Sequence, residues 1–121
     1  IDLICNRKAL EQVFLNLLRN SIKYNDKEII IINVDCTVKG NHYYFTVTDN
    51  GVGIPEDKLE SIFELFSTIG NKDRNGKKGN GIGLSTVKNI IESLGGSIIT
   101  SSEVGKGTTF EFSIKQIPLI N

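Results

Sequence analysis

Polar side chains recur at helical spacing in residues 10–25, at Gln12, Asn16, Asn20 and Lys23. At about 100° per residue, this spacing stacks them into one stripe along a helix. Asparagine gains little from the middle of a helix, because its amide competes with the backbone for hydrogen bonds. A row of amides ending in a cation suits a phosphate chain with a magnesium ion, since magnesium takes hard oxygen ligands and phosphate takes cationic donors. The alternative is an ordinary polar face turned to water.

The same segment has an apolar side that predicts a helix packed on a core. Asn6 is a suitable N-cap, so we expect the helix to begin after it, to reach about Tyr24 and to stop at Asn25 and Asp26. Before it, residues 1–4 are typical of the end of a strand. The apolar side consists of Leu10, Val13, Phe14, Leu17, Leu18 and Ile22.

A second candidate site is an Asp-Asn-Gly sequence directly after a predicted strand. Asp49, Asn50 and Gly51 are followed two places on by a further glycine, Gly53. On its own, such a sequence is an everyday turn. Two glycines leave the backbone uncovered, however, so a flat ligand could approach closely while Asp49 accepts a hydrogen bond from an exocyclic amine. Pro55 then opens a predicted short helix with an apolar side of Leu59, Ile62, Phe63 and Phe66.

Glycine and basic residues fill the next stretch, residues 67–80, which has a single aliphatic side chain. A long loop of this kind is either a lid over an anionic ligand or a solvent-exposed segment.

The glycines at 79, 81 and 83 place bare backbone amides at the start of a predicted helix. This helix ends at Gly95 and Gly96, and its start would attract anions. The pattern is not a P-loop, because no Gly-Lys-Ser/Thr follows a four-residue gap. It is not the dinucleotide fingerprint either, because Leu84 stands where the third glycine would be.

Composition excludes several classes of function. The 14 basic and 14 acidic residues cancel, so no net field favours nucleic acid or an anionic membrane surface. No apolar run reaches the ~20 residues that span a bilayer. Cys5 and Cys36 lie far apart without a CxxC pattern or a histidine cluster, which fits a reducing compartment and argues against a zinc site. Because the chain has no methionine, we expect it to be a piece of a longer protein.

Two hairpins complete the predicted fold. One spans residues 28–48 with a turn at Gly40 and Asn41, beside which His42 is interpreted as an exposed turn residue rather than a base or metal ligand. The other spans residues 97–114. The order helix, hairpin, helix, loop, helix, hairpin predicts a single α/β (α+β) two-layer sandwich over residues 1–121, a mixed, mostly antiparallel sheet covered on one face by three helices.

Five segments of the chain, taken in order, resemble the boxes of one known family. The family is that of the catalytic ATP-binding domains of sensor histidine kinases, in the GHKL superfamily. QVFLNLLRNSIKY resembles the family's asparagine box, and DNGVGIP resembles its first glycine box. IFELF resembles the phenylalanine box and GNGIGLS the second glycine box. EVGKGTTFEF resembles the final Gly-Thr segment. The resemblance covers essentially the whole chain. It implies the Bergerat-type ATP-binding fold, with the first strand and an upstream dimerisation domain lying outside this chain.

The resemblance also implies a site for ATP and Mg²⁺. Asn16 would ligate the metal through its amide oxygen, Asn20 and Lys23 would reach the phosphates, and these three would form the catalytic set. Asp49 would accept a hydrogen bond from the adenine amino group, supported by Thr108 through a water molecule. The other implied ATP-binding residues lie around the base, the phosphates or the lid: Tyr24, Gly51, Gly53, Ile54, Phe66, Gly79, Asn80, Gly81, Ile82, Gly83 and Leu84.

The chain departs from the family pattern after IFELF and in having no histidine in an acceptor setting, and it differs from the ATPases of the wider superfamily one turn before Asn16. Many relatives resembling this chain carry a basic residue two places after IFELF, where this chain has Thr68, so Lys72 or Arg74 would contact phosphate instead. The ATPases of the superfamily carry a glutamate one turn before the metal asparagine. This chain has Gln12 there, which cannot accept a proton at neutral pH, and Glu11 points about 100° away. The stripe is therefore expected to hold a phosphoryl donor rather than to hydrolyse it.

By resemblance, the γ-phosphoryl group would pass to a histidine on the protein's own dimerisation domain, within a homodimer, and then to the receiver domain of a response regulator. The acceptor histidine would lie outside this chain. The domain is expected in the cytoplasm, without contact to nucleic acid or membrane. The alternatives are a serine kinase of the anti-sigma type, which shares these boxes, and a non-catalytic nucleotide-binding module that signals by lid movement.

Overall fold

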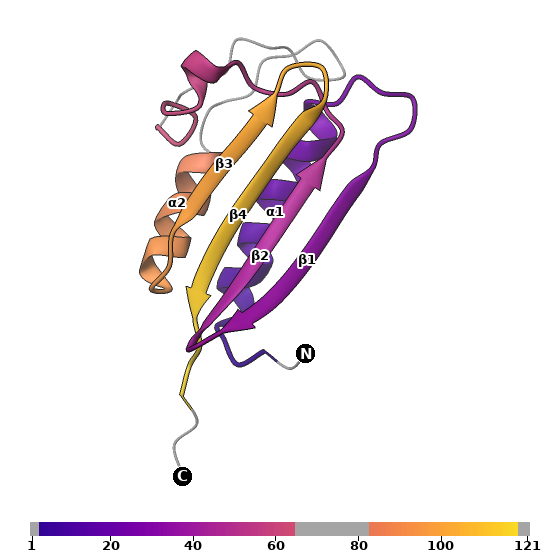
Figure 1. The fold of residues 1–121 in the computed structure, drawn as a ribbon. Helices are drawn as coiled ribbons and strands as arrows, with labels where there is room; N and C mark the ends of the chain where they lie inside the picture. Colours follow the sequence, from indigo (N-terminus) through magenta and orange to yellow (C-terminus); the bar gives the residue numbers. More distant parts are fainter. Residues whose placement is uncertain (1–2, 65–82, 119–121) are drawn as a thin grey trace.

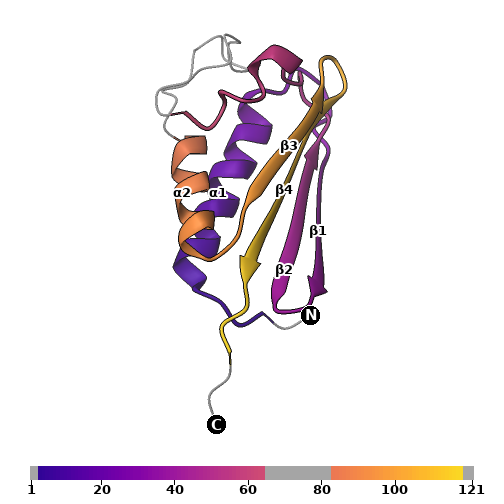
Figure 2. The same ribbon diagram turned by 60° about the vertical axis from the view of Figure 1, so that its left-hand side comes forward.

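The computed structural model describes residues 3–64 and 83–118. Two α-helices, α1 (Arg7–Lys23) and α2 (Gly83–Ser93), lie side by side on one face of a four-stranded sheet (Figure 1, Figure 2). None of the described elements covers the other face. The predicted two-layer α+β architecture is therefore confirmed. The remaining elements are β1 (Ile32–Lys39), β2 (His42–Asp49), the 3-10 helix η1 (Glu56–Lys58), β3 (Ile98–Glu103) and β4 (Gly107–Lys115).

The strand order is β1-β2-β4-β3, and every neighbouring pair is antiparallel. The parallel pair that would make the sheet mixed does not occur among the described strands. In this register Asp49 stands between Ile32 on β1 and Thr108 on β4, and Ser102 on β3 stands opposite Thr108. Directly opposite residues share a face of the sheet, so these four residues form one row across its end.

The core fills the space between the sheet and the helices. Phe45 and Phe112 stack with ring centroids 4.9 Å apart, and Phe14 of α1 packs edge-on against both rings. Side chains alternate along β2, and Val47 is completely buried on the helix side, so Asp49 also faces the helices. The largest fully buried apolar side chains are Val13, Leu17, Tyr43, Val47, Val87, Ile91, Phe110, Phe112 and Ile114.

Helix α1 begins as predicted, because the side chain of Asn6 accepts a hydrogen bond from the Ala9 N–H at 3.0 Å. Its apolar side differs from the prediction at one place, since Ile22 is 49% exposed and Ser21 is only 2% exposed. Ser21 follows the buried Leu17 by four residues and so stays in line with the core, whereas Ile22 is rotated by a further ~100°.

Two predicted elements are wrong. Residues 3–4 lie in no strand: Ile4 instead donates to the hydroxyl of Tyr43 at 2.9 Å and accepts from the N–H of Ile117 at 3.0 Å. The helix predicted after Pro55 is the short η1 followed by turns, because the backbone bonds from Lys58 to Pro55 and from Leu59 to Glu56 span three residues rather than four. Two α-helices, not three, cover the described sheet.

Strand β1 begins at Ile32 instead of at residue 28. The amide of Asn50 explains the later start, because its Nδ2 donates to the carbonyl of Ile29 and its Oδ1 accepts from the N–H of Ile31, each at 3.0 Å. A side chain therefore satisfies backbone groups that would otherwise belong to a strand ladder.

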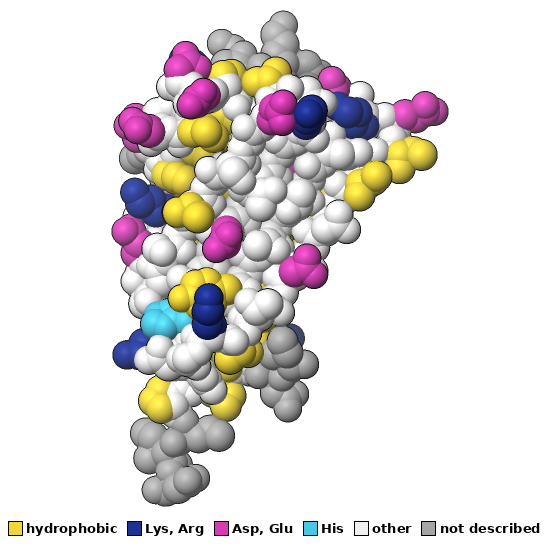
Figure 3. Space-filling view, in the orientation of Figure 1, with side chains coloured by type: hydrophobic (Ala, Val, Ile, Leu, Met, Phe, Trp, Pro, Cys, Tyr) yellow, Lys and Arg dark blue, Asp and Glu magenta, His cyan; other side chains and the backbone are white. Residues whose placement is uncertain are grey.

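The uncovered face of the sheet is largely polar (Figure 3). Thr46 and Thr48 of β2 and Thr109 of β4 point to this side, opposite the buried residues with which they alternate. Neither α1 nor α2 combines the length and apolar character that a membrane-crossing helix requires.

Candidate functional site

The candidate site lies at the end of the molecule where the elements with site residues converge. Helix α1 and strand β2 end there, and α2 and β4 begin there (Figure 1, upper end). The chain therefore brings together the asparagine stripe, the first glycine loop and the start of the helix after the second glycine loop, although long stretches of sequence separate them.

Asp49 is held by two backbone donors. Its Oδ1 accepts from the N–H of Gly51 at 2.8 Å and from the N–H of Thr108 at 3.3 Å, and the residue is 9% exposed. Its other oxygen, Oδ2, takes no hydrogen bond from the part of the chain that the structure describes. Because the two N–H groups fix the orientation of the carboxylate, Asp49 presents one free acceptor at the helix side of the sheet.

Gly51 and Gly53 are required by close backbone approaches within the protein. A Cβ at Gly51 would lie 2.6 Å from the carbonyl oxygen of Tyr24, and a Cβ at Gly53, which has φ 78°, would overlap the carbonyl of Glu103. The two glycines let the loop after β2 pack between the end of α1 and the β3–β4 hairpin. A direct role in admitting a flat ligand stays a prediction.

Thr108 contacts Asp49 directly through its backbone N–H. The hydroxyl of Ser102 donates to the carbonyl of Gly107 at 2.8 Å, accepts from the N–H of Ile54 at 2.7 Å and pairs with the hydroxyl of Thr108 at 2.9 Å. Since Ser102 has one proton to give, the Thr108 hydroxyl is the donor of that pair. Support through water stays a prediction. The same network holds Ile54, which is 4% exposed, beside the row that contains Asp49.

The asparagine stripe reaches the start of α2. A Cβ at Gly83, the first described residue of α2, would lie 3.9 Å from Oδ1 of Asn16, so this amide oxygen is adjacent to the second glycine segment. Asn16, Asn20 and Lys23 are half-buried, and the Lys23 ammonium lies 5.8 Å from the centroid of the Tyr24 ring. The amide oxygen of Asn16 thus lies near the start of a helix, where N–H groups favour anions.

The two residues at the start of the stripe, Gln12 and Glu11, lie at the surface. Gln12 is exposed, and the carboxylate of Glu11 pairs with Arg7 at 2.9 Å on the surface. Leu84 packs its side chain against the core. The remaining predicted site residues lie outside the described residues and stay predictions: Phe66, Lys72, Arg74, Gly79, Asn80, Gly81 and Ile82, together with the departure at Thr68.

The donor set suits magnesium only together with a phosphate ligand. Within residues 3–64 and 83–118, no three His, Cys, Asp or Glu side chains lie together as a metal-binding group. A Mg²⁺ ion at Asn16 would have one neutral protein oxygen and would need phosphate and water for its other ligands. Magnesium commonly binds in this way beside nucleotides.

A hollow of about 350 Å³ also borders the row of Asp49, with Thr48, Ser101 and Thr109 among its lining residues. Those three side chains belong to the uncovered face of the sheet, whereas the carboxylate of Asp49 faces the helices. The hollow is therefore not the side from which a ligand would reach the free oxygen of Asp49.

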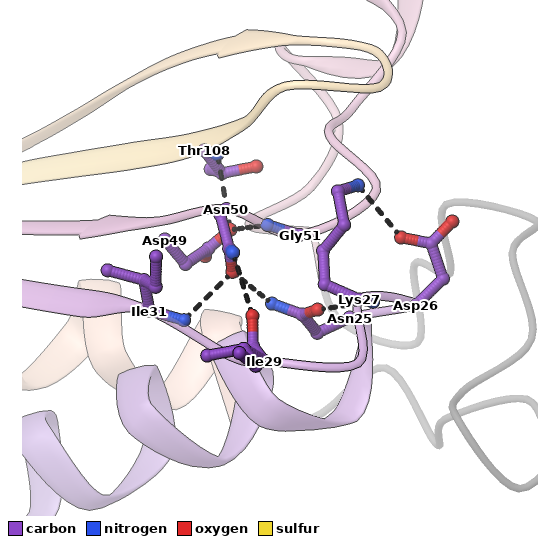
Figure 4. A network of polar contacts seen from close by, with 9 residues as sticks. All are labelled: Asn25, Asp26, Lys27, Ile29, Ile31, Asp49, Asn50, Gly51 and Thr108. Carbon is purple, nitrogen blue, oxygen red and sulfur yellow. Dashed lines mark hydrogen bonds and ion pairs between the residues drawn. The ribbon is translucent and has the colours of Figure 1, made fainter.

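Sequence reasoning missed two amides, the buried Asn25 and the half-buried Asn50, that join the parts of the site. Asn25, which is 2% exposed, donates from Nδ2 to Oδ1 of Asn50 at 2.8 Å (Figure 4). Asn25 was interpreted only as a helix stop and Asn50 only as part of a turn, which are the usual places for asparagine. Nothing in the local sequence indicates that they meet.

Comparison with known proteins gives consistent matches. Residues 5–118 match the family model described as "Histidine kinase-, DNA gyrase B-, and HSP90-like ATPase". The signal transduction histidine-protein kinase ArlS of Staphylococcus aureus (strain USA300) is 41% identical over 101 residues, which cover 84% of this chain and 22% of ArlS. The chain spans less than a quarter of the length of the curated relatives that it matches.

Solved structures show the same fold. The catalytic domain of histidine kinase ThkA matches with a TM-score of 0.77 and 31% identity, over 94% of this chain and 71% of that chain. Full-length ShkA in complex with AMPPNP matches with a TM-score of 0.73 and 26% identity, over 92% of this chain and 22% of that chain.

Proposed function

The chain belongs to the histidine kinase-, DNA gyrase B-, and HSP90-like ATPase family as the ATP-binding domain of a histidine kinase, and we propose that it holds Mg-ATP between Asp49 and Asn16. The observation that carries this proposal is the carboxylate of Asp49, buried and fixed by two N–H groups, whose second oxygen takes no hydrogen bond from residues 3–64 or 83–118. The domain would be one part of a longer kinase.

At the base end, Asp49 selects adenine by its hydrogen-bonding character. An acceptor that cannot donate pairs with the 6-amino group of adenine and leaves a 6-oxo purine unpaired. A site built around a hydrogen bond rejects a ligand that lacks it, because the buried group then loses its partner. The AMPPNP complex of the structural neighbour ShkA supports an adenine nucleotide as the ligand.

At the phosphate end, Asn16, Asn20, Lys23 and the start of α2 orient the charged groups. When bound, ATP and Mg²⁺ supply the γ-phosphoryl group and neutralise its charge. The oxygen of Asn16 holds the metal, while the amide of Asn20, the ammonium of Lys23 and the N–H groups of α2 bind phosphate oxygens. These residues align the donor, which is most of what phosphoryl transfer requires of a protein.

The acceptor brings its own nucleophile in this proposal. Gln12 cannot activate water, and Glu11 is engaged with Arg7 on the surface. We infer transfer to a histidine on the protein's dimerisation domain within a homodimer, followed by transfer to the aspartate of a response regulator. Such a reaction belongs in the cytoplasm, where ATP is available and the free cysteines Cys5 and Cys36 stay reduced.

The intact kinase with γ-labelled ATP tests this function. The expected product is acid-labile and alkali-stable, as for phosphohistidine, and Asn16→Ala should reduce its rate of formation at least about a hundredfold. The matched control is Asn33→Ala, which removes an exposed amide on β1 and should leave the rate unchanged. An acid-stable product would indicate a serine kinase instead, and tight ATP binding without labelling would indicate a non-catalytic module.

A further inference from the structure

Asn50, the residue directly after Asp49, ties three segments of the chain together with its side chain. Its Oδ1 accepts from Nδ2 of Asn25 at 2.8 Å and from the N–H of Ile31 at 3.0 Å, and its Nδ2 donates to the carbonyl of Ile29 at 3.0 Å (Figure 4). The donor and the acceptor of this amide are both engaged, so its orientation is fixed.

Asn25 is fixed in the same way just beyond the end of α1. Its Oδ1 accepts from the N–H of Lys27 at 2.8 Å while its Nδ2 binds Asn50. Burial to 2% exposure keeps water from replacing these bonds. Removing the amide of Asn50 would take a hydrogen-bond partner from a buried side chain, which is costly.

The two amides act on Asp49 through Gly51. The N–H of Gly51 is one of the two donors that orient the Asp49 carboxylate. On one side of Gly51, Asn50 is bonded to Asn25, and on the other the N–H of Val52 donates to the carbonyl of Tyr24 at 3.1 Å. Gly51 is thus anchored on both sides to the end of α1, the helix that carries the asparagine stripe.

We propose that Asn25 and Asn50 are positioning residues that set the base preference of the site by holding the Asp49 carboxylate in place relative to α1. The proposal rests on the function proposed above. Loss of the Asn25–Asn50 bond would leave Asn50 held by Ile29 and Ile31 but no longer tied to the end of α1 through its side chain, so the N–H of Gly51 would fix Oδ1 less firmly relative to α1. The carboxylate could then rotate and accept from groups other than a 6-amino group, such as the N1–H of a 6-oxo purine.

A comparison of ATP with inosine triphosphate separates positioning from general structural support. The two nucleotides share ribose, phosphates and metal, and differ at position 6 and in the proton on N1. A substitution that only loosens the fold weakens both alike. A substitution that misplaces Asp49 changes the ratio of the dissociation constants for ATP and inosine triphosphate.

The experiment measures dissociation constants for both nucleotides with Mg²⁺ by calorimetry, below the unfolding temperature of each variant. In Asn50→Ala the preference for ATP should fall about tenfold, the value of roughly one hydrogen bond to a charged group. Asn25→Ser removes the same hydrogen bond by changing its other partner, and it should also lower the preference for ATP over inosine triphosphate. Asn33→Ala, the exposed control, should keep the wild-type ratio.

Rescue and coupling sharpen the result. Asn50→Asp keeps the acceptor for Asn25 and Ile31 and loses the donor to the carbonyl of Ile29, a bond that is not part of the link to α1. Its added charge repels both triphosphates alike, so the ratio of the two dissociation constants should stay within about twofold of wild type. Asn25→Ser combined with Asn50→Ala should lower the ratio no further than Asn50→Ala alone, because the pair acts as one unit.

An unchanged ratio in a folded Asn50→Ala or Asn25→Ser protein overturns the positioning role. If the proposed function is wrong, the result is different: wild-type protein would bind neither nucleotide, or would bind both equally. That result would contradict adenine recognition by Asp49 before any variant is measured.

Discussion

The two hairpins of the sheet have similar pairing but different surroundings at their turns. At the β1–β2 turn, a Cβ on Gly40 would meet no atom within 4 Å. At the β3–β4 turn, the N–H of Gly105 donates to the carbonyl of Val52 at 2.8 Å, and Gly53 packs against the carbonyl of Glu103. A Cβ on Gly105 would also meet no atom within 4 Å, and the carbonyl of Asn41 at the β1–β2 turn accepts from the N–H of Gln116 at 2.7 Å. The two turns therefore differ in what they contact: the β3–β4 turn packs against the loop that follows Asp49, whereas the β1–β2 turn contacts the segment after β4.

This difference between the contacts of the two turns bears on why the proposed nucleotide site lies at the β3–β4 end of the sheet. Glycine with positive φ occurs at both ends, at Gly40 with φ 62° and at Gly53 with φ 78°, so turn conformation alone does not distinguish them. Close packing of backbone on backbone also occurs at both ends, since a Cβ on Gly96 at the end away from the site would overlap the carbonyl of Ser113. The difference is that the packing around Gly51 and Gly53 holds the loop whose N–H group orients Asp49.

The largest expected effect is that of Gly53→Ala. The new Cβ would overlap the Glu103 carbonyl and would also strain the positive φ, so the free energy of unfolding should fall by about 3 kcal/mol. ATP affinity should fall too, because Ile54 and Gly51 move with the loop. Denaturant unfolding and calorimetry measure the two effects.

Gly40→Ala is the control for that substitution, since it carries the same positive φ in open space and should cost about 1 kcal/mol with unchanged ATP affinity. Equal losses of stability at the two glycines would show that crowding at the β3–β4 hairpin contributes nothing.

A smaller effect is expected for Ser102→Ala, which removes the hydroxyl that joins Ile54, Gly107 and Thr108. About 2 kcal/mol of stability should be lost, because the part-buried N–H of Ile54 is left without its partner. Thermal unfolding measures the change. Ser101→Ala, one residue earlier on the exposed side of β3, should leave stability within about 0.5 kcal/mol of wild type.

The smallest effect is expected at the β1–β2 hairpin, for His42→Ala. The ring of His42 contacts Oδ1 of Asn41 at 2.8 Å and the carbonyl of Gly95 at 3.2 Å, both at the surface. Exposed hydrogen bonds are replaced by water, so the loss should be about 0.5 kcal/mol. ATP affinity should not change. A change in affinity would show that this hairpin affects nucleotide binding at the site.

The sequence predicted elements where the pattern is local. Periodicity located α1, the Asn6 cap followed from residue type, and the glycine turns located both hairpins. The tightening of the segment after Pro55 into a 3-10 turn was not predictable, because the same apolar spacing fits either kind of helix.

The links between segments were not predictable either. Asn25 and Asn50 are separated by 25 residues, and the amide of Asn50 ends the ladder of β1 early by binding Ile29 and Ile31. Each of these residues has a sufficient local explanation, so the sequence gives no reason to look for a distant partner. Such contacts decide where Asp49 points, and only the fold reveals them.

Titration of ATP with Mg²⁺ into Asp49→Asn protein, beside wild type and Asp35→Asn, tests the adenine site most directly. The asparagine would keep an oxygen for the N–H groups of Gly51 and Thr108 and would turn its NH₂ group toward the adenine amine, opposing donor to donor. The expected result is a loss of affinity of at least about a hundredfold with an unchanged unfolding temperature, while the exposed Asp35→Asn control binds as wild type does. Wild-type affinity in folded Asp49→Asn protein would contradict adenine recognition by Asp49.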